Sequence, residues 1–291
     1  MNWRDGYIAV DWGTTNRRAF SIGNDGRLIE RLADDRGVLA VGRDGFEGAA
    51  AEISARFGSA PMLLAGMVGS NRGWSEAPYI DCPAGAPALA AAIHWIEPGR
   101  IGIVPGVCQR GAAGADVMRG EEVQAIGAVV AGLVAPDGML CHPGTHAKWI
   151  RMQGGSIAGF TTSMTGEMFS LLSRHGILAD QLQGEVKASA SFAAGVADAL
   201  GGKPLLSALF GIRARWLLGE ANADASYASG LLIGSDVRAS LDGGTSEIAL
   251  IGAPELCALY AAALGIAGRE AVPIDGETAF LAGVRQLTEI L

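Results

Sequence analysis

The sequence has few cysteines and no long apolar run, and both shortages narrow what the chain can be. Its four cysteines, Cys82, Cys108, Cys141 and Cys257, lie far apart without a C-x-x-C pair, so neither a disulfide framework nor a cysteine-based metal site is indicated. No uninterrupted apolar stretch reaches the roughly 18 residues of a membrane span. The first residues, MNWRDG, lack the apolar region of a signal peptide. We therefore expect a cytoplasmic protein with no membrane partner.

Charge is also scarce, and its sign is wrong for a polyanionic partner. Charged residues make up 18% of the chain and hydrophobic residues 49%, and the net charge is −8 without any block of like charges. This composition is typical of a folded globular protein. The 291 residues are enough to bury roughly 75% of the unfolded surface. We expect no nucleic-acid partner, and a small anionic substrate would need arginines and lysines clustered at its site.

Two antiparallel meanders organise the chain. The first is expected to have strands at residues 7–11, 18–22 and 27–32, with a hairpin turn GNDG at 23–26, and the second to have strands at 139–142, 147–152 and 157–162. Expected helices at 45–57, 87–95, 116–134, 168–174, 255–264 and 278–290 alternate with strands at 62–65, 101–104 and 247–251. This alternation predicts an α/β fold.

The second meander repeats the first at an offset of 131 residues. The offset takes Gly13 to Gly144, Thr14 to Thr145, Arg17 to Lys148 and Gly23 to Gly154. Because the pattern G-T-x-x-[RK]-x5-G follows a strand in both places, the two turns are expected to have the same physical role. We expect two lobes, residues 1–135 and 136–291, each with a mixed five-stranded sheet, and a last helix near the hinge.

The repeated turns are predicted to bind phosphate. A tight turn between strands exposes several backbone N–H groups, and threonine hydroxyls add uncharged donors. Two such turns would suit the β- and γ-phosphates of one nucleotide, since charge-assisted hydrogen bonds contribute roughly 1.5–3 kcal/mol each. Neither G-x-x-x-x-G-K-[ST] nor a strand-linked G-x-G-x-x-G occurs, which leaves paired turns as the phosphate site. The predicted contacts are Gly13, Thr14, Thr15, Asn16, Gly144, Thr145, Lys148 and His146, the last of which is alternatively satisfied within its own turn.

Three segments resemble the nucleotide motifs of the actin-like ATPase superfamily, which includes the sugar kinases. They are DWGTTN at 11–16, PGTHAKW at 143–149 and LIGAPE at 250–255. The resemblance implies a two-lobed, ribonuclease H-like fold with ATP in the interlobe cleft, phosphate on the first two segments, and adenosine near Gly252 and Ala253. His142 and Pro143 stand where the superfamily commonly has an aspartate before the second turn. Asp11 is then the clear carboxylate for Mg²⁺, which is usually held through water.

Further segments resemble the 2-dehydro-3-deoxygalactonokinase family nearly end to end. They are AGMVGSNRGW at 65–74, APY at 77–79, VMRGEE at 117–122, MTGE at 164–167 and DGETAFLAG at 275–283. The resemblance implies ATP-dependent phosphorylation of the 6-hydroxyl of 2-dehydro-3-deoxy-D-galactonate in D-galactonate catabolism. It does not distinguish the galactonate keto-acid from its gluconate epimer, because no motif resolves the handedness of one hydroxyl.

Three carboxylates are candidates for the general base. Glu121 and Glu122 stand at the start of an expected helix after a glycine, and Glu167 stands in the same arrangement in the second half. Each could orient the acceptor hydroxyl, and each is also an ordinary residue for the first turn of a helix. The sequence leaves the choice open.

A polar loop and nearby arginines are predicted to bind the sugar acid. The substrate needs a cation for its carboxylate and neutral donors for its hydroxyls. One loop offers this mixture with Ser70, Asn71, Arg72 and Trp74, and Arg17 and Arg119 supply further positive charge.

Two other functions remain open. An exopolyphosphatase-like phosphohydrolase could use the same fold to activate water, although a polyanionic substrate favours a broad basic channel. An actin-like ATPase that drives assembly would need partner-binding segments for which 291 residues leave little room. The oligomeric state is also open, and a homodimer is compatible with the sequence.

Overall fold

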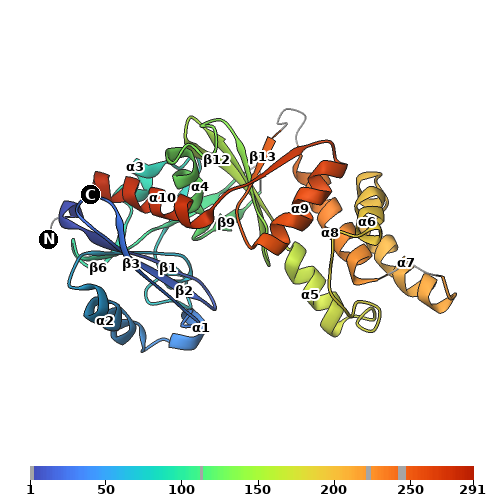
Figure 1. Cartoon of the computed structure of the whole chain (residues 1–291), viewed down its shortest axis with the longest axis horizontal. Coiled ribbons are helices and arrows are strands. Elements are labelled where there is room, and N and C mark those ends of the chain that lie inside the picture. The colour runs from blue at the N-terminus through green and yellow to red at the C-terminus, as the bar shows by residue number, and fades with distance from the viewer. Residues whose placement is uncertain (1–2, 112–113, 221–223, 242–246) are drawn as a thin grey trace. The chain divides into compact units, whose positions relative to one another are not determined.

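The computed structural model describes residues 3–111, 114–220, 224–241 and 247–291. Two compact units divide the chain. The N-terminal unit comprises Met1–Asp137, Met152–Gly159 and Asp275–Leu291, and the C-terminal unit comprises Gly138–Arg151 and Phe160–Ile274. Figure 1 shows their helices and strands, which are described unit by unit. The two functional lobes expected at 1–135 and 136–291 stay a prediction.

A six-stranded sheet forms the centre of the N-terminal unit. Its order is β3-β2-β1-β4-β7-β6, with β1 antiparallel to β2 and parallel to β4. The strands are β1 Tyr7–Trp12, β2 Arg17–Ile22, β3 Leu28–Asp34, β4 Met62–Ala65, β6 His94–Glu97 and β7 Ile101–Ile103. All four residues of β4 are buried, as are five of the six in β1, which is typical of central strands covered on both faces. The first expected meander is therefore confirmed.

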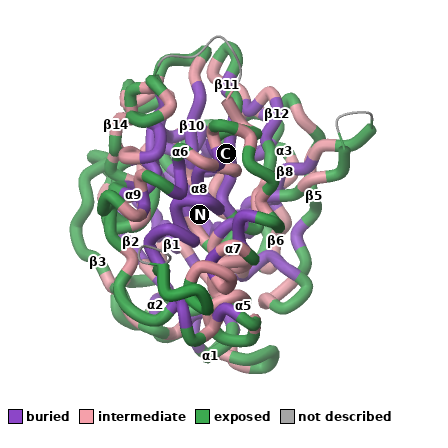
Figure 2. Tube along the Cα trace, turned by 90° about the vertical axis from the view of Figure 1, so that its right-hand side faces the viewer, coloured by how far each residue is buried: buried purple, intermediate pink, exposed green. Residues whose placement is uncertain are grey.

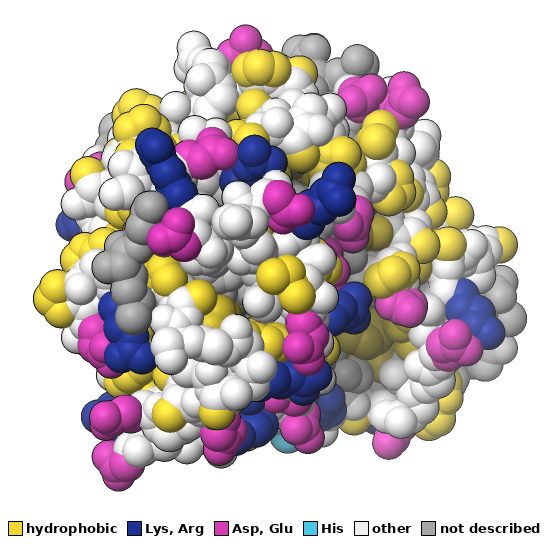
Figure 3. Space-filling view, turned by 60° about the vertical axis from the view of Figure 1, so that its left-hand side comes forward, with side chains coloured by type: hydrophobic (Ala, Val, Ile, Leu, Met, Phe, Trp, Pro, Cys, Tyr) yellow, Lys and Arg dark blue, Asp and Glu magenta, His cyan; other side chains and the backbone are white. Residues whose placement is uncertain are grey.

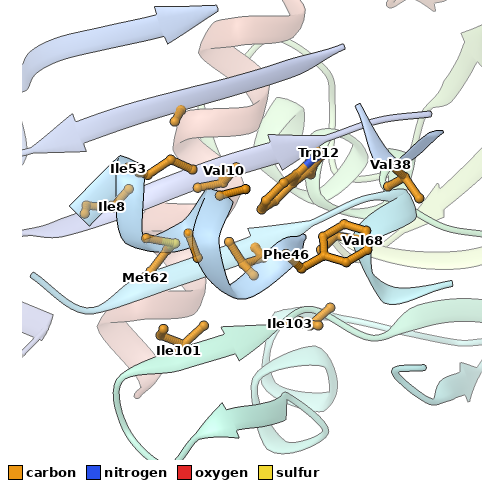
Figure 4. Close-up of a cluster of buried hydrophobic side chains, with 14 of the residues drawn as sticks. Ile8, Val10, Trp12, Val38, Phe46, Ile53, Met62, Val68, Ile101 and Ile103 are labelled. Carbon is orange, nitrogen blue, oxygen red and sulfur yellow. The ribbon is translucent and has the colours of Figure 1, made fainter. Parts of the chain in front are cut away.

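Apolar side chains fill one face of this sheet. Figure 4 shows Val10 and Trp12 of β1 packed with Phe46 of α2 and with side chains from β4 and β7. The helices of the unit are α1 Val38–Val41, α2 Phe46–Phe57, α3 Ala86–Ala91, α4 Glu121–Val130 and α10 Gly276–Ile290. Helices α4 and α10 approach closely at Gly127, where a Cβ would lie 1.8 Å from the Ala279 carbonyl oxygen. Only glycine permits that contact.

A smaller sheet and two short 3₁₀ turns complete the N-terminal unit. The sheet has the order β5-β8-β9, with β5 Tyr79–Asp81, β8 Gly106–Gln109 and β9 Asp116–Met118. The 3₁₀ turns are η1 Trp3–Asp5 and η2 Met67–Gly69. Residues 152–159 also belong here, since the Gly155 amide donates to the Pro136 carbonyl at 3.0 Å.

The C-terminal unit contains most of a five-stranded sheet with the order β12-β11-β10-β13-β14, of which residues 152–153 of β11 and 156–159 of β12 belong to the N-terminal unit. Strand β10 is antiparallel to β11 and parallel to β13, which is the arrangement that β1 has in the other unit. The strands are β10 Met139–His142, β11 Ala147–Gln153, β12 Ser156–Ser163, β13 Glu247–Leu250 and β14 Glu270–Pro273. The helices are α5 Thr165–His175, α6 Ala190–Leu200, α7 Leu205–Leu217, α8 Ala225–Ser240 and α9 Pro254–Ile266. Helix α8 is buried along most of its length, as the purple tube in Figure 2 shows.

Three expectations about the N-terminal unit were wrong in detail: the number of strands in its sheet and the bounds of two helices. The sheet has six strands instead of five, and the helix expected over 87–95 ends at residue 91, because residues 94–97 pair with β7 as β6. Trp95 and Ile96 favour a strand there. The helix expected over 116–134 spans 121–130, because residues 116–118 pair with β8 and the φ of +108° at Gly120 is incompatible with an α-helix.

No described helix is both long enough and apolar enough to span a membrane.

Candidate active site

The first turn, residues 13–16, is hydrogen-bonded to the start of α1. The carbonyls of residues 13–15 accept hydrogen bonds of 3.0–3.1 Å from the amides of residues 37–39, and the Gly13 amide donates to Asn16 at 2.9 Å. Thr14, Thr15 and Asn16 are exposed, and within the described residues their amides donate to no backbone carbonyl. The turn thus presents free N–H groups, as a phosphate site requires.

Gly37 makes this construction sterically feasible. A Cβ at Gly37 would lie 2.3 Å from the carbonyl carbon of Thr15 and 2.5 Å from the carbonyl oxygen of Thr14. Sequence reasoning missed this residue. The available signal was a glycine directly before the short apolar run VLAV, which does not reveal what the glycine packs against.

The second turn, residues 143–146, has the same construction in the C-terminal unit. The Thr145 carbonyl accepts a hydrogen bond of 2.9 Å from the Glu167 amide at the start of α5. A Cβ on Gly166 would lie 2.5 Å from the Gly144 carbonyl oxygen. The amides of residues 144–146 donate to no backbone carbonyl in the described part of the chain. Both repeated turns are therefore supported by a helix start and a close glycine.

Two side chains flank the second turn in different environments. His146 is exposed and Glu167 is partly exposed, and their Nε2 and Oε2 atoms lie 2.6 Å apart. Lys148 lies opposite His142 in the β10–β11 ladder and is 6% exposed. Lys148 follows the second turn by two residues, so its ammonium is a candidate to pair with an anion bound at that turn.

An apolar cavity of about 160 Å³ lies beside the second turn. Its lining residues are Gly144, Thr165, Gly166, Phe169, Val186, Ser229, Leu232, Ile233, Leu256, Leu259 and Tyr260. Gly252, just before α9, lies next to the second turn, since a Cβ on Gly252 would be 3.2 Å from the Pro143 carbonyl oxygen. Ala253 is the N-cap residue of α9. The mostly apolar lining of the cavity is typical of a site that binds a flat aromatic group.

Asp11 is the second-last residue of β1 and lies directly opposite Arg18 of β2, and the two side chains form an ion pair through Oδ2 of Asp11. The Asp11 side chain is 22% exposed. It lines an open hollow of about 560 Å³ together with the turn residues 13–16. Free turn amides and a partly exposed carboxylate thus share one hollow in the N-terminal unit.

Arg17 is directed away from solvent. It is 2% exposed, and its Nη2 and Nε donate to the two carboxylate oxygens of Asp34 at 2.6 and 3.2 Å. Desolvation raises the pKa of Asp34, but hydrogen bonds from Arg17 and the Arg36 amide outweigh it, and the pKa lies below its ordinary value. Arg17 is therefore committed to the sheet, and we leave it out of the proposed substrate site.

Two glycines bring the remaining candidates of the N-terminal unit toward Asp11. A Cβ on Gly66 would be 3.6 Å from Oδ1 of Asp11, and a Cβ on Gly120 would be 3.2 Å from the Gly66 Cα. Both glycines have positive φ angles, +95° and +108°. The loop after β4 and the start of α4 consequently meet beside the Asp11 carboxylate.

Glu121 and Glu122 follow Gly120 but differ in exposure. Glu122 is fully buried, and its Oε2 accepts a hydrogen bond of 2.6 Å from the Gly120 amide. Glu121 is partly exposed, and its Oε2 accepts a bond of 3.2 Å from the Arg119 amide. Of these two carboxylates, Glu121 is the one with solvent-exposed surface.

Arg119 is buried with part of its hydrogen-bonding capacity unused. Its Nη2 donates to the Ala77 carbonyl at 2.8 Å, and its guanidinium carbon lies 4.3 Å from the ring centre of Tyr79. Nε and Nη1 are buried and have no hydrogen-bond partner among the described residues. The positive charge is therefore fixed in place, with donors left for an anion or water.

The loop 70–74 divides into structural and exposed members. The Ser70 hydroxyl donates to the Met67 carbonyl at 2.8 Å, and Trp74 stacks on Phe46 with ring centres 6.4 Å apart. Both therefore hold the loop in shape. Asn71 and Arg72 are exposed and remain the candidates for direct contact with a substrate.

Comparison with known proteins agrees with these motifs. A profile of the family described as 2-keto-3-deoxy-galactonokinase matches residues 11–287. The 2-dehydro-3-deoxygalactonokinase of Escherichia coli (strain K12) is 34% identical, with 97% of each chain covered. A protein of Rhizobium meliloti (strain 1021), named probable 2-dehydro-3-deoxygalactonokinase DgoK1, is 38% identical, covering 96% of this chain and 95% of the relative.

A solved structure extends the likeness to three dimensions. The crystal structure of a 2-dehydro-3-deoxygalactonokinase protein from Sinorhizobium meliloti has a TM-score of 0.89 and 35% sequence identity, covering 97% of each chain. The expected α/β fold with mixed sheets is confirmed. The chain therefore belongs to the 2-keto-3-deoxy-galactonokinase family.

Proposed function

We propose that the protein transfers the γ-phosphoryl group of ATP to the 6-hydroxyl of 2-dehydro-3-deoxy-D-galactonate, giving 2-dehydro-3-deoxy-6-phosphogalactonate for D-galactonate catabolism. The observation that carries this proposal is the family match over residues 11–287, which includes both phosphate turns. Because ATP is a cytoplasmic cosubstrate, the proposal assigns the enzyme to the cytoplasm.

The two turns are proposed to hold the phosphates of one ATP. The free amides of residues 14–16 and 144–146 would donate to phosphate oxygens, and Lys148 would neutralise part of their charge. The adenine ring would occupy the apolar cavity beside Gly144, next to Gly252 and Ala253. Phosphoryl transfer depends mainly on such positioning and charge compensation.

The residues present fit a Mg²⁺ ion carried by ATP. This ion is commonly bound by one or two carboxylates together with phosphate oxygens and water. Asp11 lines the same hollow as the first turn, so its carboxylate and the ATP phosphates would hold the ion. When bound, Mg²⁺ neutralises charge on the transferred phosphoryl group.

For the acceptor, we propose that Arg72 and Arg119 face the carboxylate, that Asn71 binds hydroxyl groups, and that Glu121 takes the proton from the 6-hydroxyl. Glu121 is favoured over Glu122 because it is partly exposed. Glu167 is also partly exposed, pairs with His146 and is the alternative base. The Glu121→Gln and Glu167→Gln variants separate them, since the true base should show the larger fall in kcat.

Assaying ATP and Mg²⁺ with a panel of sugars and 2-keto-3-deoxy acids tests the proposal. We expect a phosphate ester of the galactonate keto-acid. Release of inorganic phosphate without an acceptor would indicate a hydrolase, and nucleotide-dependent sedimentation without transfer would indicate an assembly ATPase. On the face drawn in Figure 3, the Lys and Arg side chains of the described residues are interspersed with Asp and Glu, which does not resemble the broad basic channel of a polyphosphate enzyme.

Lys148→Met is expected to raise the Kd for ATP about tenfold or more, because a charge-assisted hydrogen bond is lost while the aliphatic stem stays. Isothermal titration measures the affinity. Lys187→Met is the matched control, since that ammonium pairs with Glu185 and its side chain is 65% exposed. Equal affinity of the Lys148 variant and the wild type would contradict a phosphate contact.

The burial of Glu122 predicts that the stability of the folded protein depends on pH. Desolvation, followed by the charge of Glu121, raises the pKa of Glu122 from 4.5 to about 8. The folded state then keeps a proton that the unfolded state has released, so stability falls as the pH rises from about 4.5 to about 8. Glu122→Gln stays neutral and should flatten this part of the Tm curve. Parallel curves of Tm against pH for Glu122→Gln and the wild type would contradict this effect of Glu122.

We also propose a reversible homodimer through the outer face of α7. Leu206, Phe210 and Leu217 are 80%, 61% and 63% exposed, and with Arg213 they follow the i, i+4, i+7, i+11 spacing of one helix face. The spacing is symmetric about its centre. In an antiparallel pair, Leu206 would meet the second copy's Leu217, and Phe210 would meet the second copy's Arg213 in a cation–π contact.

Phe210→Glu is expected to abolish this association without lowering kcat. Sedimentation velocity across a concentration range measures it. Ile29→Glu is the control, because Ile29 of β3 is 70% exposed against 61% for Phe210 but lies outside α7. A wild-type chain that stays monomeric at every concentration would refute the α7 interface.

A further inference from the structure

Asp236 is a buried carboxylate at the centre of the C-terminal unit. It lies on α8 and is 5% exposed. A buried carboxylate is costly unless donors surround it. Three side chains from three other elements supply those donors.

Each donor comes from an element that carries part of the proposed nucleotide site. The Trp149 indole N–H donates to Oδ1 at 3.0 Å, and Trp149 follows Lys148 on β11. The Thr165 hydroxyl donates to Oδ2 at 3.0 Å, and Thr165 begins the helix that supports the second turn. The Tyr260 hydroxyl donates to Oδ2 at 2.6 Å, and Tyr260 lies on α9.

The donors are also tied to the apolar cavity. Thr165 and Tyr260 are among its lining residues. Desolvation and the neighbouring Asp236 carboxylate raise the pKa of Tyr260, so the phenol keeps its proton and remains a donor. The carboxylate thus fixes two walls of the cavity and the strand that bears Lys148.

We propose that Asp236 is a positioning residue for ATP, holding β11, α5 and α9 in the arrangement that the phosphates and the adenine ring require. This rests on the proposed function, because it assumes that ATP binds at the second turn. Asp236 itself need not touch the nucleotide. Its effect is transmitted through Trp149, Thr165 and Tyr260.

The test is ATP binding and steady-state kinetics for Asp236→Asn. An asparagine offers one acceptor oxygen and places an NH₂ group against groups that donate. We expect the Kd and KM for ATP to rise about tenfold or more, while the KM for the keto-acid and the kcat at saturating ATP stay near their wild-type values. A merely structural role would not produce this split.

Asp198→Asn is the matched control. Asp198 also accepts a hydrogen bond from a tyrosine, Tyr227, at 2.5 Å, and it pairs with Lys203, but its partners do not line the cavity. This variant should lower Tm and leave the Kd for ATP unchanged. If Asp236→Asn does not fold, Thr165→Val and Tyr260→Phe each remove one bond and should each raise the Kd for ATP by a smaller factor.

The outcomes separate the two claims. A wild-type chain that binds no ATP overturns the proposed function and this inference with it. If the wild type binds ATP and the Asp236, Thr165 and Tyr260 variants that fold bind it equally well, this inference alone is overturned. A rise in the Kd for ATP confined to these variants supports it.

Discussion

Asp11→Asn is expected to lower kcat by at least about a hundredfold while leaving the fold intact. The substitution keeps the shape of the side chain but removes the carboxylate charge that would organise the Mg²⁺ of ATP at the first turn. Little stability should be lost, because the pair with Arg18 is partly exposed, at 22% and 38%, and such pairs contribute about 0–1 kcal/mol. Steady-state kinetics and thermal unfolding of the same preparation measure both effects.

Asp34→Asn is the matched comparison. Asp34 has the same 22% exposure and also pairs with an arginine of β2, but that arginine is the buried Arg17. Losing this partner should cost about 1–3 kcal/mol of unfolding free energy, with turnover of the folded enzyme retained. An Asp11→Asn enzyme with wild-type kcat would remove Asp11 from the mechanism.

Gly37→Ala is expected to weaken ATP binding severely. The new methyl group would collide with backbone atoms of Thr14 and Thr15 at 2.3–2.5 Å, and neither backbone atom can rotate aside. The turn or α1 must then move, at a cost of about 1–3 kcal/mol, and the free amides lose their alignment. Isothermal titration with ATP should show a rise in Kd of at least about tenfold.

Gly48→Ala on α2 controls for the substitution itself. A Cβ there meets nothing within 4 Å, so alanine should stabilise the helix by about 0.5–1 kcal/mol. The affinity for ATP should not change. Unchanged ATP affinity in Gly37→Ala as well would show that the first turn does not need its support from α1.

Much of the fold was predictable because it depends on local patterns. Strand 62–65 is apolar throughout and short, and the hairpin turn GNDG favours one geometry. The pattern fails where pairing between distant segments decides. Residues 116–118 resemble the start of the helix that follows them, and only β8, as their partner, makes them a strand.

The site was predictable in its turns but not in its supports. Glycine and threonine after a strand reveal a donor-rich turn, whereas Gly37 and Gly166 are identified only by the backbone atoms that they approach. Likewise, Arg17 matches Lys148 in the repeat, yet Asp34 occupies its guanidinium. Asp236 has no motif at all, since its three donors come from distant parts of the chain.

A crystal structure with a non-hydrolysable ATP analogue and the keto-acid tests the central proposal most directly. We predict that the analogue's phosphates accept hydrogen bonds from the amides of both turns, with the 6-hydroxyl of the acid directed at the γ-phosphorus. A triphosphate that contacts one turn alone, or neither, would contradict the proposal.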